Sequence, residues 1–375
     1  MGALAIGCAQ PHPPEVAFTP PTLRAAFKDA FLVGAALNAA QFSGRDTLGA
    51  AIVTAQFNSI TPENVLKWAS VHPRPGTYDF AAPDRYVAFG ERHGMFIVGH
   101  TLVWHNQTPR WVFQDSGGHP VSRDTLLERL RDHIHTVVGR YRGRIRGWDV
   151  VNEALNEDGT LRRTPWLAIL GDDYLASAYR FAGEADPGAE LYYNDYSLEN
   201  APKRRGAVEL VKRLRDQGVP ITAVGLQGHN RMDWPSAAQE DSTIDAFAGA
   251  GFRVMITELD VDVLPRATRA PGAELADTAV SRGGAALNPF VNALPDSLQR
   301  ALARRYAELF DSYLRHRGTV ARVTFWGVTD RDSWLNNWPV PGRTNYPLLF
   351  DRDGRPKPAF DAIARTAPAK EGRHD

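Results

Sequence analysis

Two glutamates, Glu153 and Glu258, each follow an apolar segment typical of a buried strand. Paired carboxylates at such positions suit cleavage of a glycosidic bond, in which one protonates the leaving oxygen and the other attacks or activates water. The acid must keep its proton near neutral pH, which requires an apolar or anionic neighbourhood. Asn152, directly before Glu153, could donate a hydrogen bond to a sugar hydroxyl. His229 and Asp260 could form a chain with Glu258 in which His229 orients that carboxylate and keeps it ionised.

Other apolar segments also end in polar or aromatic residues. A neutral, polyhydroxylated sugar requires many hydrogen bonds and flat apolar faces on which to stack, and amides, indoles and a few charges supply both. These segment ends therefore favour a sugar site over other hydrolase sites. They are Thr61–Trp68, His100–Gln107, Asn194–Tyr196, Gln227–His229 and Trp326.

Three other chemistries are possible in principle. A metal-dependent hydrolase lacks its usual signatures, because the sequence has neither a His-x-His after the first strand nor an HExxH helix, and we expect no metal or other cofactor. A serine nucleophile lacks the GxSxG turn. A sugar-binding protein without activity would keep Trp104, Trp326 and Trp334 but normally lose one carboxylate. The potential metal ligands are His100, His105, His229, Asp195 and Asp260.

Composition excludes several classes of partner. The 375 residues include 43 Lys+Arg and 43 Asp+Glu, a formal net charge of +0. No basic excess is available to neutralise a phosphate backbone, so nucleic acid is not an expected partner. The single cysteine, Cys8, excludes an internal disulfide framework and Cys-ligated zinc. No apolar run approaches the roughly 20 residues needed to span a bilayer.

The elements that position these residues alternate between strands and helices. The strand segments are continuously apolar, as in parallel strands covered on both faces. Strands alternating with amphipathic helices predict one (β/α)8 TIM barrel, whose catalytic groups lie at the carboxyl ends of the strands. An open doubly wound sheet is the alternative, but no GxGxxG follows the first strand. The predicted strands are Phe31–Leu37, Phe57–Ile60, Phe96–His100, Ile145–Val151, Glu190–Asn194, Ala223–Gln227, Arg253–Thr257 and Arg322–Trp326, and the clearest helices are Thr125–Val138, Pro202–Gln217 and Ser297–His316.

Two segments stand apart from this alternation. Val263–Pro295, rich in Ala, Pro, Arg and Gly, is predicted to be an insertion between the seventh and eighth strands. Residues 1–20 are predicted to be a leader or spacer and 21–370 the barrel domain. Leu4–Cys8 resembles the end of a bacterial lipoprotein signal, which would make the protein secreted, periplasmic or lipid-anchored. A frayed terminus of a cytoplasmic protein is the alternative.

Seven strings of residues, in order on successive strand ends, resemble the family 10 glycoside hydrolases, the endo-β-1,4-xylanases of the (β/α)8 class. The resemblance extends from about Phe31 to Arg365. One string would be weak evidence, whereas seven in order are very specific. They are TPENVLKW (61–68), GHTLVWHNQTP (99–109), WDVVNEALNEDG (148–159), YYNDY (192–196), GLQGH (225–229), ITELDV (256–261) and TFWGVTDRDSWL (324–335).

The resemblance implies a role for each matching residue in a retaining double displacement on xylan or xylo-oligosaccharides by a monomer. Glu153 would be the acid/base and Glu258 the nucleophile, with carboxyl groups about 5–5.5 Å apart. His229 and Asp260 would hold Glu258 ionised, and Asn152 would contact the 2-hydroxyl of the reacting sugar. The remaining implied roles fall into three groups: Glu63, Asn64 and Lys67 would bind the next sugar on the non-reducing side; His100, Trp104, Gln107, Trp326 and Trp334 would frame the glycone subsites; Tyr196 and Gln227 would lie near the leaving group.

Simpler structural roles are the alternatives for several of these residues. Lys67 could form an ordinary ion pair at the barrel rim. Asp195 could cap the following helix. Trp148 and Trp166 lie in or beside apolar runs and are expected in the core. The charged run Glu199–Arg215 is expected to be a solvated helix face.

Overall fold

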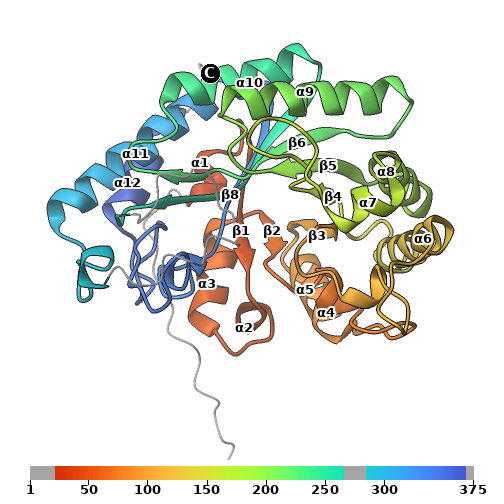
Figure 1. The fold of residues 1–375 in the computed structure, drawn as a ribbon. Helices are drawn as coiled ribbons and strands as arrows, with labels where there is room; N and C mark the ends of the chain where they lie inside the picture. Colours follow the sequence, from red (N-terminus) through yellow and green to blue (C-terminus); the bar gives the residue numbers. More distant parts are fainter. Residues whose placement is uncertain (1–21, 266–283, 369–375) are drawn as a thin grey trace, which may run out of the picture.

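Eight parallel strands close into a barrel in the computed structural model, which describes residues 22–265 and 284–368 (Figure 1). Neighbouring strands pair in chain order, and closure comes from the pairing of β1 with β9 and of β6 with β8. The (β/α)8 prediction is therefore confirmed. The barrel strands are β1 (Leu32–Leu37), β2 (Ser59–Pro62), β3 (Phe96–Val103), β4 (Gly147–Asn152), β5 (Glu190–Asp195), β6 (Ala223–Leu226), β8 (Arg253–Asp262) and β9 (Val320–Phe325).

Helices surround the barrel and cover its outer face (Figure 1). Their apolar residues join those of the strands in one large core, which includes the fully buried rings of Trp148 and Trp166, as predicted. The α-helices are α1 (Leu23–Ala26), α2 (Ala39–Phe42), α3 (Thr47–Gln56), α4 (Trp68–Val71), α5 (Ala81–Arg92), α6 (Arg123–Arg140), α7 (Pro165–Leu170), α8 (Asp173–Ala185), α9 (Ala201–Asp216), α10 (Ala237–Gly249), α11 (Asp296–Arg315) and α12 (Pro358–Thr366), and the 3-10 helices are η1 (Arg110–Val112), η3 (Gly284–Leu287) and η4 (Trp334–Asn336).

The three predicted helices correspond to α6, α9 and α11, with ends one or two residues away from the predicted ones. Helix α9 begins with a proline in its first turn and is followed by Gly218 at φ +70, a conformation that favours glycine after a helix end. One of the described strands was not predicted from the sequence. A short strand, β7 (His229–Arg231), pairs with the end of β8 outside the barrel ladder.

Close packing at the barrel wall explains why residue 99 is a glycine. The ring of Trp148 on β4 lies against Gly99 on β3 and occupies the place where a Cβ would be. Any larger residue at position 99 would displace this buried indole.

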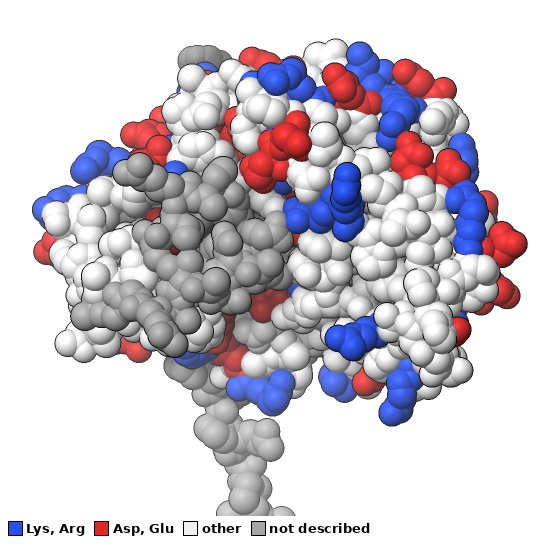
Figure 2. Space-filling model, viewed as in Figure 1, with Lys and Arg blue, Asp and Glu red and all other residues white. Residues whose placement is uncertain are grey.

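The predicted leader, residues 1–20 with Cys8, lies outside the described residues. Of the predicted insertion, the structure describes residues 263–265 and 284–295, which include η3. Within the described part of the chain, no helix is long and apolar enough to cross a membrane. Basic and acidic side chains are interspersed over the face shown in Figure 2, in keeping with the balanced formal charge.

One surface prediction is wrong in part. The charged run Glu199–Arg215 was expected to be solvated, but Glu199 and Lys203 are 3% and 0% exposed. Glu199 lies two residues before α9 and Lys203 lies in its first turn, where the chain leaves the barrel rim, and both side chains are buried. Charge alone does not distinguish these positions from the exposed face of the same helix.

Candidate active site

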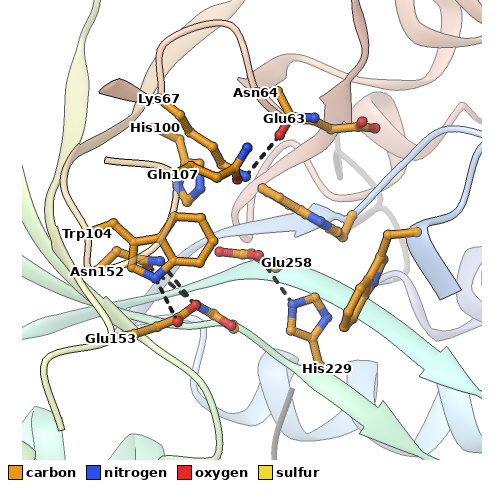
Figure 3. A pocket seen from close by; sticks show the side chains of 13 residues that line it. Glu63, Asn64, Lys67, His100, Trp104, Gln107, Asn152, Glu153, His229 and Glu258 are labelled. Carbon is orange, nitrogen blue, oxygen red and sulfur yellow. Dashed lines mark hydrogen bonds and ion pairs between the residues drawn. The ribbon is translucent and has the colours of Figure 1, made fainter. Parts of the chain in front are cut away.

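A pocket opens at the carboxyl ends of the barrel strands (Figure 3). All thirteen of its lining residues were singled out from the sequence. Two further predicted residues, Asp260 and Tyr196, are not among the residues that line this pocket. The lining residues are Glu63, Asn64, Lys67, His100, Trp104, Gln107, Asn152, Glu153, Gln227, His229, Glu258, Trp326 and Trp334.

Local backbone irregularities aim the two glutamates into this pocket. Glu153 follows β4 directly and has φ +57, an uncommon value for a residue with a side chain. Its amide donates to Asn194 O on the neighbouring strand at 2.8 Å. Glu258 lies within β8, where the register against β9 shifts between Ile256 and Leu259. Such a shift changes the direction in which a side chain points.

Three donors surround the Glu153 carboxyl group. Trp104 Nε1 donates to Oε2 at 2.8 Å, while Gln227 Nε2 and Asn152 Nδ2 donate to Oε1 at 3.0 and 3.1 Å. Burial raises the pKa of Glu153, and the charges of Asp195 and Glu258 raise it further, against the opposing hydrogen bonds from Gln227 and Trp104. This environment favours the protonated acid.

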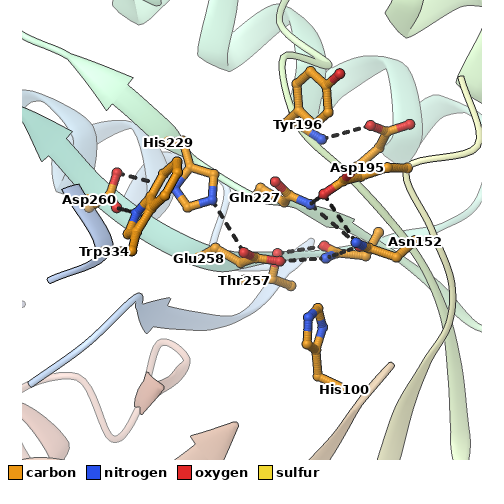
Figure 4. A network of polar contacts seen from close by, with 12 residues as sticks. His100, Asn152, Asp195, Tyr196, Gln227, His229, Thr257, Glu258, Asp260 and Trp334 are labelled. Carbon is orange, nitrogen blue, oxygen red and sulfur yellow. Dashed lines mark hydrogen bonds and ion pairs between the residues drawn. The ribbon is translucent and has the colours of Figure 1, made fainter. Parts of the chain in front are cut away.

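The Glu258 carboxyl group has the opposite tendency. Burial alone would raise its pKa, but the hydrogen bond from His229, the charge of His100 and the hydrogen bond from Asn194 together lower it. His229 Nε2 lies 3.2 Å from Glu258 Oε2, and His229 Nδ1 lies 3.1 Å from Asp260 Oδ1 (Figure 4). Although burial opposes its charged form, Asp260 and Glu258 raise the pKa of His229 to about 10. The imidazolium therefore keeps Glu258 ionised.

Two residues of this network, Asn194 and Thr257, were missed as site residues. Asn194 Nδ2 donates to Asn152 Oδ1 and to Glu258 Oε1, each at 2.8 Å. Thr257 Oγ1 donates to Asn194 Oδ1 at 2.6 Å and so fixes the orientation of that amide. Asn194 therefore links the surroundings of the two glutamates, since Asn152 in turn donates to Glu153. The sequence feature that could have indicated a role for Asn194 is its position at the end of β5, immediately before Asp195.

One wall of the pocket comes from the segment after β2. Lys67 Nζ donates to Asn64 Oδ1 at 3.1 Å and lies 4.9 Å from the centre of the Trp104 ring. Burial lowers the pKa of Lys67, while the charges of Glu258, Glu153 and Glu63 oppose that effect. Burial raises the pKa of Glu63 to about 7, against the lowering influence of Lys67. This wall therefore holds a cation and a weak acid that can both bond to hydroxyl groups.

Aromatic and imidazole rings form another part of the lining. His100 Nδ1 lies 2.9 Å from Asp149 Oδ2, a contact that fixes the ring, and the His100 and Trp326 rings meet edge to face at 5.4 Å. Trp334 stacks on Trp338, with ring centres 4.8 Å apart. Two indoles beside a row of hydrogen-bonding groups can hold a sugar by stacking and by polar contacts.

Comparison with known proteins is consistent with this geometry. The model for glycosyl hydrolase family 10 matches residues 22–366. The chain belongs to glycosyl hydrolase family 10. It is 43% identical to endo-1,4-beta-xylanase A of Xylanibacter ruminicola over 93% of this chain and 94% of that protein. It is 41% identical to a beta-1,4-xylanase of Dictyoglomus thermophilum, over 92% of this chain and 91% of that one.

Solved structures of family 10 proteins have the same fold. A GH10 endoxylanase retrieved from a sugarcane soil metagenome superposes with a TM-score of 0.88, at 44% identity, over 92% of this chain and 99% of that one. Xylanase XynB of Paenibacillus barcinonensis has a TM-score of 0.83 at 37% identity and covers 93% and 99% of the two chains.

Asp195 is the last residue of β5, and it and Tyr196, which follows it, lie on the Gln227 side of this family 10 pocket (Figure 4). Asp195 does not cap α9, for which Asn200 is the N-cap residue. Its Oδ1 instead accepts the Tyr196 amide at 2.9 Å and lies 3.0 Å from Lys203 Nζ. The capping alternative is therefore wrong, and Asp195 acts within the rim.

The potential metal ligands do not converge. Across residues 22–265 and 284–368, no group of three or more His, Cys, Asp and Glu side chains is arranged to hold a metal ion. His100 and His229 instead face Asp149 and Asp260, respectively. The arrangement brings a carboxyl group with a raised pKa and one with a lowered pKa into one pocket, and glycosidic bond cleavage uses one carboxyl group as acid and the other as carboxylate.

Proposed function

We propose that this family 10 protein is an endo-1,4-β-xylanase that hydrolyses internal β-1,4-xylosidic bonds with net retention of configuration. The observation that carries the proposal is the opposite tuning of two carboxyl groups in one pocket, because Glu153 has a raised pKa and Glu258 a lowered one. Pairs of titratable groups with divergent pKa values identify the acid and the base of a site. The xylanase names of the relatives support xylan as the substrate.

In the first step, the ionised Glu258 attacks the anomeric carbon while Glu153 transfers its proton to the departing oxygen. A glycosyl ester on Glu258 forms, and the sugar on the reducing side leaves. Hydrogen bonds from His229 and Asn194 hold the Glu258 oxygens in place before the attack. Asn152 is placed beside Glu153 to bond to the 2-hydroxyl group, a contact that strengthens as positive charge develops on the ring.

In the second step, Glu153 acts as a base. It removes a proton from water, the resulting hydroxide attacks the anomeric carbon, and Glu258 is released as a carboxylate. Two inversions give a product of the β configuration. Loss of negative charge from Glu258 in the ester removes one of the influences that raise the pKa of Glu153. Its carboxylate form is thereby favoured when a base is needed.

We infer the direction of the bound sugar chain from the residues of the pocket wall. The hydroxyl groups of the second sugar on the non-reducing side would bind to Glu63, Asn64 and Lys67. The faces of the sugars would pack on Trp326 and Trp334. Tyr196 and Gln227 would contact the leaving sugar. We also infer that residues 21–370 form one catalytic unit and that the protein acts as a monomer. The molar mass in solution, measured by light scattering, tests the monomeric state.

Proton NMR of xylohexaose hydrolysis tests the reaction. Anomeric signals recorded in the first minutes should show the β-anomer, followed by mutarotation to α. Early α-anomer would exclude Glu258 as the nucleophile while leaving a glycosidase. Binding of xylan without cleavage would exclude hydrolysis and leave a sugar-binding barrel.

A further inference from the structure

Lys203 lies in the first turn of α9 and is completely buried. The amino end of a helix carries a partial positive charge, so a cation there is unfavourable. Burial of an ammonium group adds a desolvation cost. A buried lysine at this position therefore needs strong compensating contacts, and those contacts point toward the leaving-group side of the pocket.

Three groups surround the Lys203 ammonium. Nζ lies 3.0 Å from Asp195 Oδ1 and 3.1 Å from Glu157 Oε1. It also lies 3.5 Å from the centre of the Tyr196 ring, within the range of a cation–π contact. Tyr196 is thus held by the Lys203 ammonium against its ring and by the Asp195 carboxylate at its amide.

The same contacts reach the segment that carries Glu153. Glu157 lies four residues after Glu153 and is bound twice by Asn200, whose Nδ2 donates to Glu157 O at 3.1 Å and to Oε2 at 3.2 Å. Arg162 donates to Tyr196 Oη at 2.6 Å and to Glu153 O at 3.3 Å. Helix α9, the Tyr196 ring and the segment after β4 are therefore joined around one cation.

We propose that Lys203 is a positioning residue for the leaving-group side of the reaction. Its ammonium group fixes the Tyr196 ring and, through Glu157, the segment after Glu153, so that the sugar on the reducing side is held against the proton donor. This inference rests on the proposed function, because it assigns the leaving sugar to the Tyr196 side. Tight positioning of the reacting groups lowers the barrier by fixing geometry before the chemical step.

The test compares two substrates with Lys203→Met, which keeps an unbranched side chain one heavy atom shorter and removes the ammonium group. Xylohexaose places sugars on the leaving-group side, whereas 4-nitrophenyl β-xylobioside has an activated phenol there and no sugar. We expect kcat/KM to fall at least tenfold for xylohexaose and less than threefold for the aryl xylobioside. Covalent labelling of the nucleophile with a 2-fluoro xylobioside gives the active fraction of each preparation. Lys203→Arg should restore most of the xylohexaose activity.

If Lys203 had a purely structural role, Lys203→Met would lower the active fraction and reduce both kcat/KM values by the same factor. Equal losses after correction for active sites, or no loss, would overturn the proposal. Lys212→Met is the matched control, since Lys212 is an exposed lysine of the same helix, and it should change neither value. If Lys203→Met does not fold, Glu157→Gln removes one partner of the cation, and the same selective loss is expected. Failure of the unmodified protein to cleave xylohexaose would instead contradict the proposed function.

Discussion

The indole of Trp334 donates a hydrogen bond to Asp260 Oδ2 at 2.7 Å. The other oxygen of that carboxylate faces His229, which in turn contacts Glu258. A tryptophan of the pocket lining is thereby linked to the hydrogen-bonded chain that keeps Glu258 ionised. Trp334, which we propose packs on a sugar face, is therefore also connected to the orientation of Glu258.

Trp334→Phe separates these two contributions because it keeps an aromatic ring and removes the N–H donor. A hydrogen bond to a charged group contributes about 1.5–3 kcal/mol. We expect kcat/KM for an aryl β-xylobioside to fall about tenfold, the rate equivalent of about 1.4 kcal/mol. Trp111→Phe is the control, since its indole donates to Pro73 O away from the pocket. Equal losses in the two variants would show that the Trp334 bond has no particular effect on turnover.

The strand ends were predictable from sequence because the barrel brings them to one rim. Asn152, Glu153, Gln227 and Glu258 could thus be placed together without knowledge of any distance. Asn194 was missed as a site residue because an amide at a strand end is common, and only its two contacts, with Asn152 and Glu258, reveal its role.

Lys203 was missed for a different reason. Its neighbours in sequence are charged and mostly solvated, so its own burial depends on contacts with Asp195 and Glu157 from other parts of the chain. Helical periodicity gives the face on which a residue lies. It does not show that a rim segment covers the first turn of that helix. The short strand β7 was missed similarly, since three residues are too few for a periodic pattern.

Removal of each glutamate should give different products when azide is supplied. Glu258→Ala should abolish turnover, and azide should attack from the vacated side to give an α-xylosyl azide. Glu153→Ala should still form the glycosyl ester from substrates with good leaving groups, because acid assistance matters least for them. Azide should then open that ester to give the β-xylosyl azide. NMR of the two products is the measurement, and identical anomers would contradict the assigned roles.

The pH profile of kcat/KM should be bell-shaped. Activity falls on the acid side as Glu258 gains a proton, and that limb lies below the ordinary glutamate value because the pKa of Glu258 is lowered. Activity falls on the basic side as Glu153 loses its proton, and that limb lies above the ordinary value because its pKa is raised. His229→Asn removes the principal contact that lowers the pKa of Glu258. The acid limb should move to higher pH.

Profiles recorded from pH 3 to 9 with an aryl xylobioside check this shift. The basic limb should stay near its original position, because Glu153 depends mainly on its own burial. His135→Asn serves as the control, since His135 pairs with Glu184 on the outer surface. An acid limb that does not move in His229→Asn would remove His229 from the chain that holds Glu258 ionised.

Glu63→Ala should affect only substrates that reach the second glycone sugar. A charge-assisted hydrogen bond contributes about 1.5–3 kcal/mol, so kcat/KM for an aryl β-xylobioside should fall about tenfold or more. An aryl β-xyloside is too short to reach Glu63 and should be unaffected. Since the pKa of Glu63 is raised to about 7, the defect should grow between pH 6 and pH 8 as the wild-type carboxylate forms. Equal losses on both substrates would contradict the assignment.

Glu240→Gln should stabilise the protein, and more so at higher pH. Glu240 is fully buried on α10, and burial and the charge of Glu199 raise its pKa to about 8. In the unfolded chain the carboxyl group ionises near pH 4.5. Between these values the unfolded state loses the proton first, so the free energy of unfolding falls as pH rises. Glutamine does not ionise, so the variant avoids this loss of stability at higher pH. Melting temperatures at pH 5 and pH 8 should show a larger gain at pH 8, whereas Glu209→Gln on the exposed face of α9 should show none. A gain independent of pH would mean that Glu240 ionises at the same pH in the folded and unfolded states, which would contradict the raised pKa.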